Sequence, residues 1–323
     1  MPGPAFEGTN AREPKEACVS VIDHLVIGML PVIPRPIIGC FSKRYIAGQT
    51  LADALAEARR LNADGCMVTM DVLGEDVRDR EQALRARDAY LDLIPALADA
   101  GIDGNVSLKP TMLGLTTSPD FAYENIRPLV ALAHERGGFV RIDMEDATTT
   151  DRTLDVYRRL RADFDNTGVV LQACLRRTLK DAEELAHLRA NVRLCKGIYI
   201  EPYAISWRDR EIIRANYLYA LEVLLRGGAY VGIATHDEWL VAKAMHLVHR
   251  LGLAPHQYEF QMLLGVAERL RRVIVADGHR LRVYVPFGRE WYAYSTRRLR
   301  ENPSMAGTIA RDILGLSAER RRR

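Results

Sequence analysis

The sequence contains no CxxC pair, and its 5 cysteines are odd in number and far apart. A zinc ribbon or a disulfide framework needs cysteines paired at short or regular spacings, so neither is indicated. Free thiols within apolar runs are typical of a reducing compartment. We therefore expect a cytoplasmic protein without disulfides. The cysteines are Cys18, Cys40, Cys66, Cys174 and Cys195.

A long apolar run is also missing. The longest stretch, residues 25–41, is interrupted by three prolines and an arginine, so it is too broken and too short to span a bilayer. The first twenty residues contain three glutamates and no apolar core, so we expect no secretory signal. The sequence thus predicts a protein that does not cross a membrane, although residues 25–41 could form a helix that rests on one.

The sequence has little excess of charge of either sign. Its 45 basic and 42 acidic residues leave a formal charge of +3, and the run Arg320–Arg323 alone contributes four positive charges. Proteins that bind nucleic acids usually carry a basic face or stripe, which is not visible here, so we expect no nucleic-acid partner. The composition, 48% apolar and 27% charged, is that of an ordinary globular protein.

Eight short β-rich runs alternate with helical patterns along most of the chain. Such alternation predicts parallel strands joined by right-handed crossovers, and eight strands close a (βα)8 barrel. An open doubly wound sheet is the alternative, but neither the GxGxxG turn nor the P-loop that would support it occurs. We therefore predict the α/β class with a single barrel. The runs are residues 66–73, 105–113, 139–145, 169–175, 192–199, 230–236, 258–263 and 281–287.

The helical patterns have recognisable starts and ends. Residues 50–61 predict an amphipathic helix with Leu51, Leu55 and Ala58 on one side. Several later helices are expected to end at a glycine: Gly101, Gly137, Gly227, Gly252 and Gly278.

The ends of the chain differ in composition from the barrel. Residues 1–17 are polar, and we expect a flexible arm there. We expect residues 18–316 to form the barrel with its N-terminal helices, and residues 317–323 to form a basic tail.

The predicted strands are polar on one face. In residues 139–145, Arg141, Asp143 and Glu145 share one face and apolar residues share the other, because alternate residues of a strand point to opposite sides. Helices must cover the apolar faces, so the polar faces point into the barrel, which is normally filled with Val, Ile and Leu. This pattern predicts a deep mouth that holds a large polar ligand. Internal ion pairs, such as Asp143 with Lys109 or with Arg141, are the alternative.

The segment after the eighth run carries a basic and aromatic cluster. On a helix that starts near Arg289, Tyr294, Arg297 and Arg298 fall within about one turn of each other. Two guanidinium groups and a phenol can hold a carboxylate in a fixed orientation. A solvated basic helix face is the alternative, but the active-site end of a barrel favours the carboxylate site.

Three weaker signals lie at other strand ends. Arg193 and Lys196 end the fifth run and Gly197 begins its loop, which suits a phosphate or an electron-rich ring. His236 ends the sixth run, but a lone histidine there is more often a structural hydrogen-bonding group. Lys109 follows an apolar strand and could form a Schiff base, as in barrel aldolases. The residues alone therefore leave a Schiff-base lyase open, and no metal site is indicated.

Taken together, seven segments resemble the bacterial monofunctional proline dehydrogenases in order and register, over about residues 42–302. The resemblance implies a distorted TIM-like barrel with N-terminal helices and a final helix that carries a substrate clamp over the barrel mouth. It also implies non-covalent FAD, oxidation of L-proline to 1-pyrroline-5-carboxylate, and a quinone or other electron acceptor at the inner face of the cell membrane. The segments are VSLKPTMLGL, RIDMED, VVLQACLRR, VRLCKGIYIEP, GIATHDE, YEFQMLLGV and YVPFGREWYAYSTRRLREN.

The resemblance also assigns roles by matching positions. Arg297 and Arg298 resemble the carboxylate clamp, and Glu75 resembles an acidic gate that pairs with it. The remaining substrate positions are Tyr284 and Tyr294, which resemble walls of the proline pocket, and Lys109 and Asp143, which resemble the pair beside the substrate amine and the flavin. The positions that resemble flavin contacts are Gln172, Arg193, Lys196, Gly197, Ile198, Tyr199, Thr235, His236, Asp237 and Glu301.

Three positions depart from the family pattern. Ile198 stands where the family usually has alanine, Cys195 where it usually has valine, and Asp237 where some members have asparagine. Ile198 leaves open the flavin-dependent oxidation of another cyclic or carrier-bound proline-like substrate. Tyr284 argues against hydroxyproline, because relatives that oxidise it resemble the family with a smaller residue there. A non-catalytic flavin-binding protein is the remaining alternative.

Overall fold

The computed structural model describes residues 35–74, 77, 79–292 and 294–296. The chain divides into two compact units, one made of residues 42–291 and the other of residues 1–41 and 292–323. The arm expected at residues 1–17 and the tail expected at residues 317–323 lie outside the described residues. Residues 291, 292 and 294–296 are helical, as predicted for the segment after the eighth strand.

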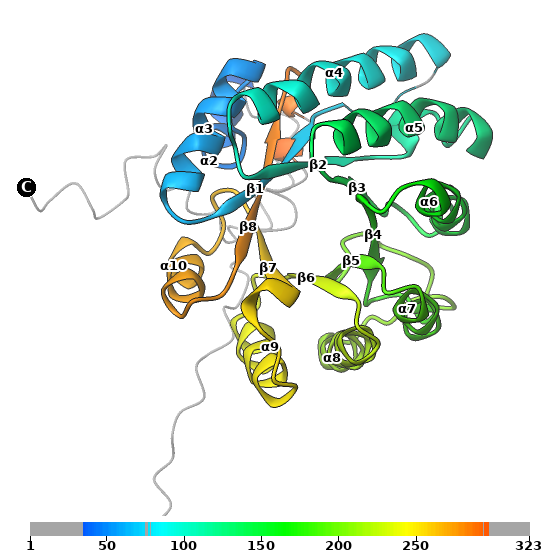
Figure 1. The fold of residues 1–323 in the computed structure, drawn as a ribbon, viewed down its shortest axis with the longest axis vertical. Helices are drawn as coiled ribbons and strands as arrows, with labels where there is room; N and C mark the ends of the chain where they lie inside the picture. The colour runs from blue at the N-terminus through cyan, green and yellow to red at the C-terminus, as the bar shows by residue number, and fades with distance from the viewer. Residues whose placement is uncertain (1–34, 75–76, 78, 293, 297–323) are drawn as a thin grey trace, which may run out of the picture. The chain divides into compact units, whose positions relative to one another are not determined.

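Residues 42–291 contain a closed barrel of eight parallel strands, in which each strand pairs with the next and β8 pairs with β1 (Figure 1). The predicted barrel is therefore confirmed. The strands are β1 (Met67–Val72), β2 (Gly104–Leu108), β3 (Val140–Ile142), β4 (Thr167–Gln172), β5 (Asn191–Cys195), β6 (Tyr230–Ala234), β7 (Tyr258–Leu263) and β8 (Leu281–Phe287).

Helices surround the ring of strands in Figure 1 and connect successive strands. Two further helices, α2 (Arg35–Tyr45) and α3 (Leu51–Ala63), precede β1. In the described part of the chain, none of the helices combines the length and the apolar character needed to cross a membrane. The others are α4 (Arg80–Asp99), α5 (Pro119–Glu135), α6 (Thr150–Asp163), α7 (Thr178–His187), α8 (Arg210–Arg226), α9 (Glu238–Arg250) and α10 (Glu268–Ala276), with the short 3-10 helices η2 (Thr111–Leu113) and η3 (Pro255–Gln257).

Several predicted strands end earlier than the sequence pattern indicates. The second run was expected to extend to residue 113, but β2 ends at Leu108 and the 3-10 helix η2 follows. Pro110 causes this difference, because it adopts helical angles (φ −57°, ψ −35°) and has no N–H to donate to a neighbouring strand. The boundaries of β7 and β8 agree with the prediction.

The predicted helix ends are mostly confirmed. Gly101, Gly137, Gly252 and Gly278 follow helices with φ between 63° and 81°, a left-handed conformation that favours glycine. Gly227 is confirmed as the C-cap of α8, but its φ is −77°, and its neighbour at position 228 takes the left-handed conformation with φ 78°.

Helix α3 begins at a capping box. The Thr50 side chain accepts a hydrogen bond from the Asp53 backbone, and the Asp53 carboxylate accepts one from the Thr50 backbone. The side of α3 that is fully buried contains Ala54, Ala58 and Leu61, whereas Leu51 and Leu55, which we expected on that side, are only partly buried.

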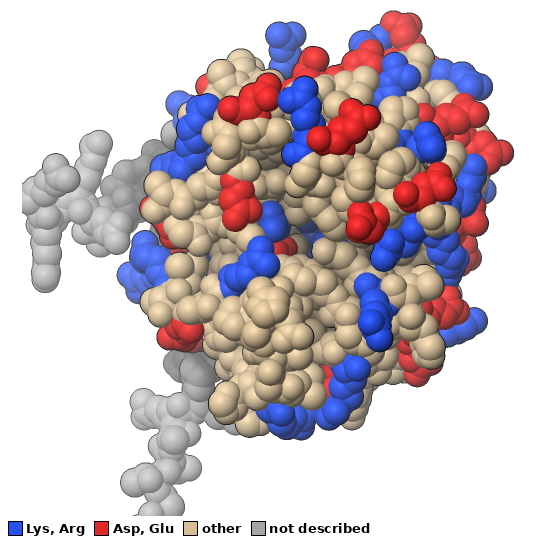
Figure 2. Space-filling model, viewed as in Figure 1, with Lys and Arg blue, Asp and Glu red and all other residues tan. Residues whose placement is uncertain are grey.

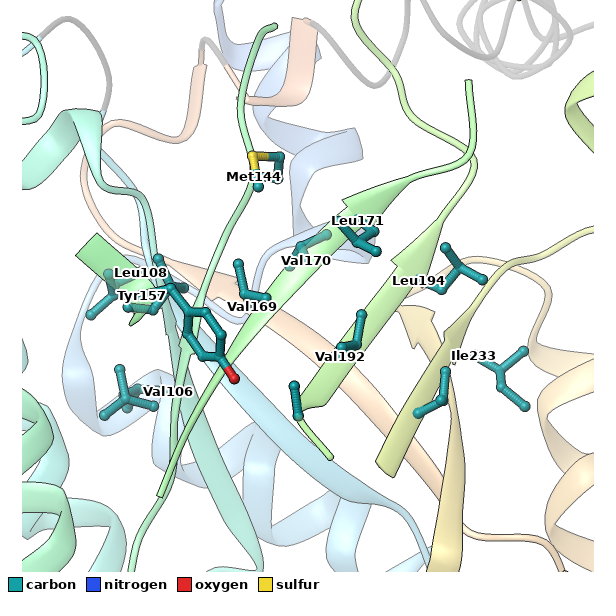
Figure 3. Packing of buried hydrophobic residues seen from close by; sticks show 14 of the residues in the cluster. Val106, Leu108, Met144, Tyr157, Val169, Val170, Leu171, Val192, Leu194 and Ile233 are labelled. Carbon is teal, nitrogen blue, oxygen red and sulfur yellow. The ribbon is translucent and has the colours of Figure 1, made fainter. Parts of the chain in front are cut away.

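The outward faces of the strands pack against the helices as one apolar layer. Figure 3 shows the side chains of Leu171, Leu194 and Ile233 on neighbouring strands, and each is at most 2% exposed. Register continues this row to Phe260 and Leu281, which are also buried. At about 25 cal/mol per Å² of apolar surface, this layer is the main source of the barrel's stability. Its position outside the strands leaves the polar faces pointing inward, as predicted.

The surface around α4 to α7 carries both signs of charge. On the face shown in Figure 2, Lys and Arg side chains are interspersed with Asp and Glu side chains. Many of them form exposed ion pairs, such as Arg158 with Glu184 and Arg159 with Asp120. Such exposed pairs contribute little to the free energy of unfolding.

Gly168 makes room for a buried arginine inside the barrel. It lies beside Arg141 in the register of β3 and β4, and Arg141 is only 1% exposed. A Cβ at position 168 would lie 2.5 Å from Arg141 Nη1 and would also overlap the Asn191 carbonyl oxygen. The absence of a side chain at this position therefore allows the arginine to lie across the barrel floor.

We predict that Gly168→Ala lowers the free energy of unfolding by about 2 kcal/mol, because the added methyl group overpacks the interior against backbone that cannot move away. Urea denaturation measures this change. Gly138→Ala is the matched control, since a Cβ there meets no atom closer than 3.4 Å. Equal stabilities of the two variants would contradict the prediction.

Candidate active site

Charged and polar side chains meet where the carboxyl ends of the strands converge. Asp71 ends the inward face of β1, Lys109 and Asp143 follow β2 and β3, Arg193 lies on β5 and Tyr284 on β8. In barrels of this kind the loops that follow the strands form the active site. Hydrogen bonds join Asp143, Arg193 and Tyr284 into one network, and Lys109 forms a pair with Asp71. All of these residues except Asp71 were singled out by the sequence pattern.

Asp143 is the centre of this network. Its Oδ1 accepts hydrogen bonds from Ser107 Oγ at 2.6 Å and from Arg193 Nη1 at 2.6 Å. Its Oδ2 accepts one from the Tyr284 hydroxyl at 3.2 Å, and the Arg193 guanidinium lies 5.3 Å from the centre of the Tyr284 ring. The alternative of internal ion pairing therefore holds for Asp143, but its partner is Arg193 and not Lys109 or Arg141, which were the examples suggested by the sequence.

Lys109 pairs instead with Asp71. Its Nζ lies 2.7 and 2.9 Å from the two carboxylate oxygens, and the Tyr90 hydroxyl approaches Asp71 Oδ1 at 3.3 Å. Burial by itself lowers the pKa of Lys109, but the charges of Asp71 and Asp143 outweigh burial, so the pKa is raised. A Schiff-base lysine needs a neutral amine, so this pairing argues against the lyase alternative.

Asp71 is a site residue that sequence reasoning missed. It is fully buried, and its only signal in the sequence is a carboxylate within the otherwise apolar run MVTMDV. A buried carboxylate requires a cationic partner, so such a residue in an inward position indicates that a lysine or arginine lies nearby.

Arg141 lies deeper in the barrel than this network. Its guanidinium donates to the carbonyl oxygens of Val169 at 2.9 Å and Asn191 at 2.7 Å, and to the Asn191 side chain. Within the described residues its hydrogen-bond partners are all neutral, and its Nε has none. Burial and the nearby charge of Arg193 lower the pKa of Arg141 to about 9. Arg141 therefore belongs to the barrel floor, not to the site.

The ends of β4 and β5 bring several predicted flavin positions together. Gly197 adopts φ 96°, and a Cβ there would overlap Cys174 Sγ and lie 3.2 Å from Gln172 Oε1. Gln172 Nε2 donates to the Glu145 carbonyl oxygen at 2.7 Å. The backbone at Gly197 therefore packs closely against β4, which a residue with a side chain could not do.

The residues after β6 have identifiable structural contacts. The Asp237 carboxylate accepts two hydrogen bonds from Arg214 at 2.9 Å and lies 3.2 Å from Lys196 Nζ. Burial raises the pKa of Asp237, but these two cations outweigh it and lower the pKa to about 2. Thr235 Oγ1 accepts from the Asp237 backbone, and His236 Nε2 accepts from the backbone of the residue at position 263 at 2.8 Å. The expected hydrogen-bonding role of His236 is thus observed.

An exposed apolar segment follows β5. The side chains of Ile198, Ile200, Tyr203 and Ile205 are between 42% and 88% exposed, although isoleucine is usually buried. We refer to these four residues as the apolar loop. The guanidinium of Arg176 stacks on Tyr203, with 5.1 Å from its carbon to the ring centre. Tyr199, within the same segment, is half-buried.

Four predicted site residues lie outside the described part of the chain: Glu75, Arg297, Arg298 and Glu301. Tyr294 is described, and its side chain is 5% exposed. It belongs to the unit formed by residues 1–41 and 292–323, so the clamp and the gate stay predictions. Within the described ranges, no three or more His, Cys, Asp or Glu residues are arranged to hold a metal ion.

A family model described as proline dehydrogenase matches residues 54–311, which is most of the chain. The chain belongs to the proline dehydrogenase family. A proline dehydrogenase of Deinococcus radiodurans is 36% identical over 278 residues, covering 84% of this chain and 90% of the relative. Proline dehydrogenase 1 of Bacillus subtilis is 33% identical over 273 residues, with the same coverage. The resemblance inferred from the seven segments is confirmed, and with it the oxidoreductase class.

Solved structures share the fold. Proline utilization A from Bdellovibrio bacteriovorus, inactivated by N-propargylglycine, superposes with a TM-score of 0.77 and 27% identity over 81% of this chain. A mutant of proline utilization A from Bradyrhizobium japonicum gives 0.71 at 22% identity, a likeness that concerns the fold alone. This chain spans about a third of each of those longer proteins, 32% in both cases.

We predict that Lys109→Met lowers the free energy of unfolding by about 3 kcal/mol, because it leaves the Asp71 carboxylate buried without a cation. Asp71→Asn should be destabilising for the reciprocal reason. The double variant should lose less than the sum of the two, since both changes remove one shared contact. Urea denaturation of the three variants measures the coupling, and additive losses would show that the pair does not couple.

Proposed function

We propose that this protein oxidises L-proline to 1-pyrroline-5-carboxylate by hydride transfer to FAD, the first step of proline catabolism. The observation that carries the proposal is the Arg193–Asp143–Tyr284 network at the barrel mouth of a chain from the proline dehydrogenase family. The relatives described above are named for the same activity, and the polar, buried character of this mouth fits a small zwitterionic substrate beside a large polar cofactor.

The residues present fit a flavin. Arg193 Nη2 is buried and has no hydrogen-bond partner among the described residues, so it is a donor available to an electron-rich ring. The Gly197 backbone packs directly against Gln172 and Cys174, which keeps this loop close to β4, and Lys196 supplies a positive charge at the same loop. We propose that FAD is held by the predicted set: Gln172, Arg193, Lys196, Gly197, Ile198, Tyr199, Thr235, His236, Asp237 and Glu301.

Each part of the network then has a task. When bound, the flavin supplies the two-electron acceptor for the hydride. Asp143 is fixed by three hydrogen bonds and Lys109 by its pair with Asp71, so both present rigid polar groups to the substrate amine. Such preorganisation holds two reactants in position and lowers the barrier to their reaction. We propose that Tyr284 and Tyr294 form walls of the pocket.

The carboxylate of the substrate needs a separate site. We propose that Arg297 and Arg298 bind it, because two adjacent guanidinium groups match the geometry of a carboxylate. We propose further that Glu75 pairs with this clamp and closes the site over the substrate, since closure excludes water from the reaction.

The electrons must leave for an acceptor. We propose a cytoplasmic enzyme at the inner face of the cell membrane that passes them to a quinone or another acceptor. The apolar loop supports this, because its exposed side chains follow β5 directly beyond Arg193 and could contact an apolar molecule or surface. The proposed chain organisation is a barrel in residues 18–316 with an arm at 1–17 and a tail at 317–323.

We predict that the purified protein contains FAD, is yellow, and is bleached by L-proline in the absence of oxygen. Visible absorption measures the bleaching, and a panel of cyclic amino acids with an artificial electron acceptor measures specificity. Hydroxyproline should react poorly because Tyr284 is large. Reaction with another cyclic or carrier-bound substrate but not with L-proline would favour the alternative suggested by Ile198. A colourless protein that binds no FAD would overturn the proposal.

We predict that Arg298→Lys keeps FAD bound and raises KM for L-proline at least tenfold. Lysine is a point charge that cannot reproduce the planar two-donor contact of arginine with a carboxylate, and a charged hydrogen bond is worth about 1.5–3 kcal/mol. Steady-state kinetics with an artificial acceptor measure KM, and Arg289→Lys on the same segment is the control. An unchanged KM in Arg298→Lys would remove this residue from the clamp.

A further inference from the structure

A chain of buried polar residues lies behind Arg193 that the proposed function does not use. Gln261 and Glu259 lie on the inward face of β7, and Arg282 on that of β8; they are 5%, 2% and 8% exposed. Burial of three polar side chains is unfavourable unless each is hydrogen-bonded, and these three are bonded to one another. Because these residues are connected to Arg193 by hydrogen bonds, they can influence the candidate active site.

Glu259 is the anchor of this chain. Its carboxylate accepts hydrogen bonds from Arg282 Nε at 2.8 Å and Nη2 at 3.0 Å, and from the Tyr230 hydroxyl at 2.9 Å. Burial raises the pKa of Glu259, but the charge and hydrogen bonds of Arg282 outweigh it and lower the pKa to about 2. Glu259 is therefore ionised, and its oxygens can only accept hydrogen bonds.

Gln261 connects this anchor to Arg193. Its Nε2 donates to Glu259 Oε1 at 2.6 Å, and its Oε1 accepts from Arg193 Nε at 2.5 Å. Because the ionised Glu259 only accepts, the NH2 end of the amide must face it, and the carbonyl end must face Arg193. Gly232, on β6, allows this placement, since a Cβ there would overlap Gln261 Nε2.

The contacts of Arg193 fix its guanidinium at two points. Nε is held by Gln261, and Nη1 donates to Asp143 and to Ser107 Oγ at 3.0 Å. Nη2 is buried and has no partner among the described residues. We propose that Gln261 is a positioning residue for the oxidation: it holds the Arg193 guanidinium so that Nη2 donates to the bound flavin. The inference rests on the proposed function and assigns Gln261 a part in it.

Loss of the Gln261 contact has a defined consequence. With Nε released, the guanidinium can turn about the remaining contacts of Nη1 with Asp143 and Ser107, so its positive charge is less well placed beside the flavin. A preorganised cation stabilises negative charge that develops in the reaction, and a poorly placed one does so less. The reduced flavin should then be less stable relative to the oxidised form, and its midpoint potential should become more negative.

The test compares Gln261→Met with Tyr230→Phe in the FAD-loaded full chain. Each variant removes one hydrogen bond from Glu259, but only the first releases Arg193. The measurements are the free energy of unfolding, FAD content, the midpoint potential of the bound flavin, and kcat and KM for L-proline.

Gln261→Met should lose more stability than Tyr230→Phe, because it removes two hydrogen bonds instead of one and leaves Arg193 Nε buried without a partner. Both variants should keep FAD. Only Gln261→Met should shift the midpoint potential downward and lower kcat about tenfold, the equivalent of one charged hydrogen bond, with KM unchanged. If Gln261→Met does not fold, Gly232→Ala gives the same test. The added methyl group displaces the Gln261 amide from Arg193 but removes none of its hydrogen-bonding groups.

A Gln261→Met protein with unchanged potential and kcat would overturn the inference while the proposed function stands. The same shift of the midpoint potential in Tyr230→Phe would also overturn the inference, because the effect would then come from the loss of any hydrogen bond to Glu259 and not from the release of Arg193. If L-proline fails to bleach the unmodified protein, the proposed function fails and this inference fails with it.

Discussion

Every charge inside the closed barrel needs a partner, because the paired strands separate the interior from bulk water. The described residues form three ion pairs inside the barrel, and two of them join neighbouring strands or the residue that follows one: Lys109 with Asp71, and Arg282 with Glu259. The third, Arg193 with Asp143, passes over β4 and joins β5 to the residue after β3. This pair crosses the interior, so the positions of the other polar residues near the mouth depend on it.

Glycines on the strands make room for polar side chains inside the barrel. In the strand register, Gly168 lies beside Arg141, and Gly232 lies beside Arg193. The missing side chain at Gly168 leaves space for the Arg141 guanidinium, and the missing side chain at Gly232 leaves space for the Gln261 amide that holds Arg193. A valine or leucine would normally fill this layer. A polar interior therefore requires space for long side chains as well as partners for their charges. A glycine in an inward position of a strand is a sequence signal that such a side chain lies nearby.

The sequence was sufficient for the closed barrel and for the face of each strand, because period-2 alternation is a local property. It was not sufficient for the ion pairs. Asp143, Lys109 and Arg141 were correctly placed inside the barrel. Which of them are in contact depends on the tilt and stagger of the strands, because these set the height of each side chain relative to its neighbours around the barrel. Pro110 shows a second limit of the sequence prediction. A proline that ends a strand is visible in the sequence, but the apolar residues around Pro110 led us to extend the predicted strand beyond it.

An inward polar residue has the same sequence signature whether it meets a ligand or a buried partner. What separates the two cases in this fold is position along the strand. Glu259 and Arg282 are each the second residue of their strands, and both are used up by contacts within the barrel. Lys109 and Asp143 follow the ends of theirs, where the loops open. Arg193, at the middle of β5, has one guanidinium nitrogen, Nη2, that finds no hydrogen-bond partner among the described residues. Arg193 therefore belongs both to the barrel floor and to the barrel mouth. Through Arg193, the packing of the floor determines where a positive charge lies at the mouth.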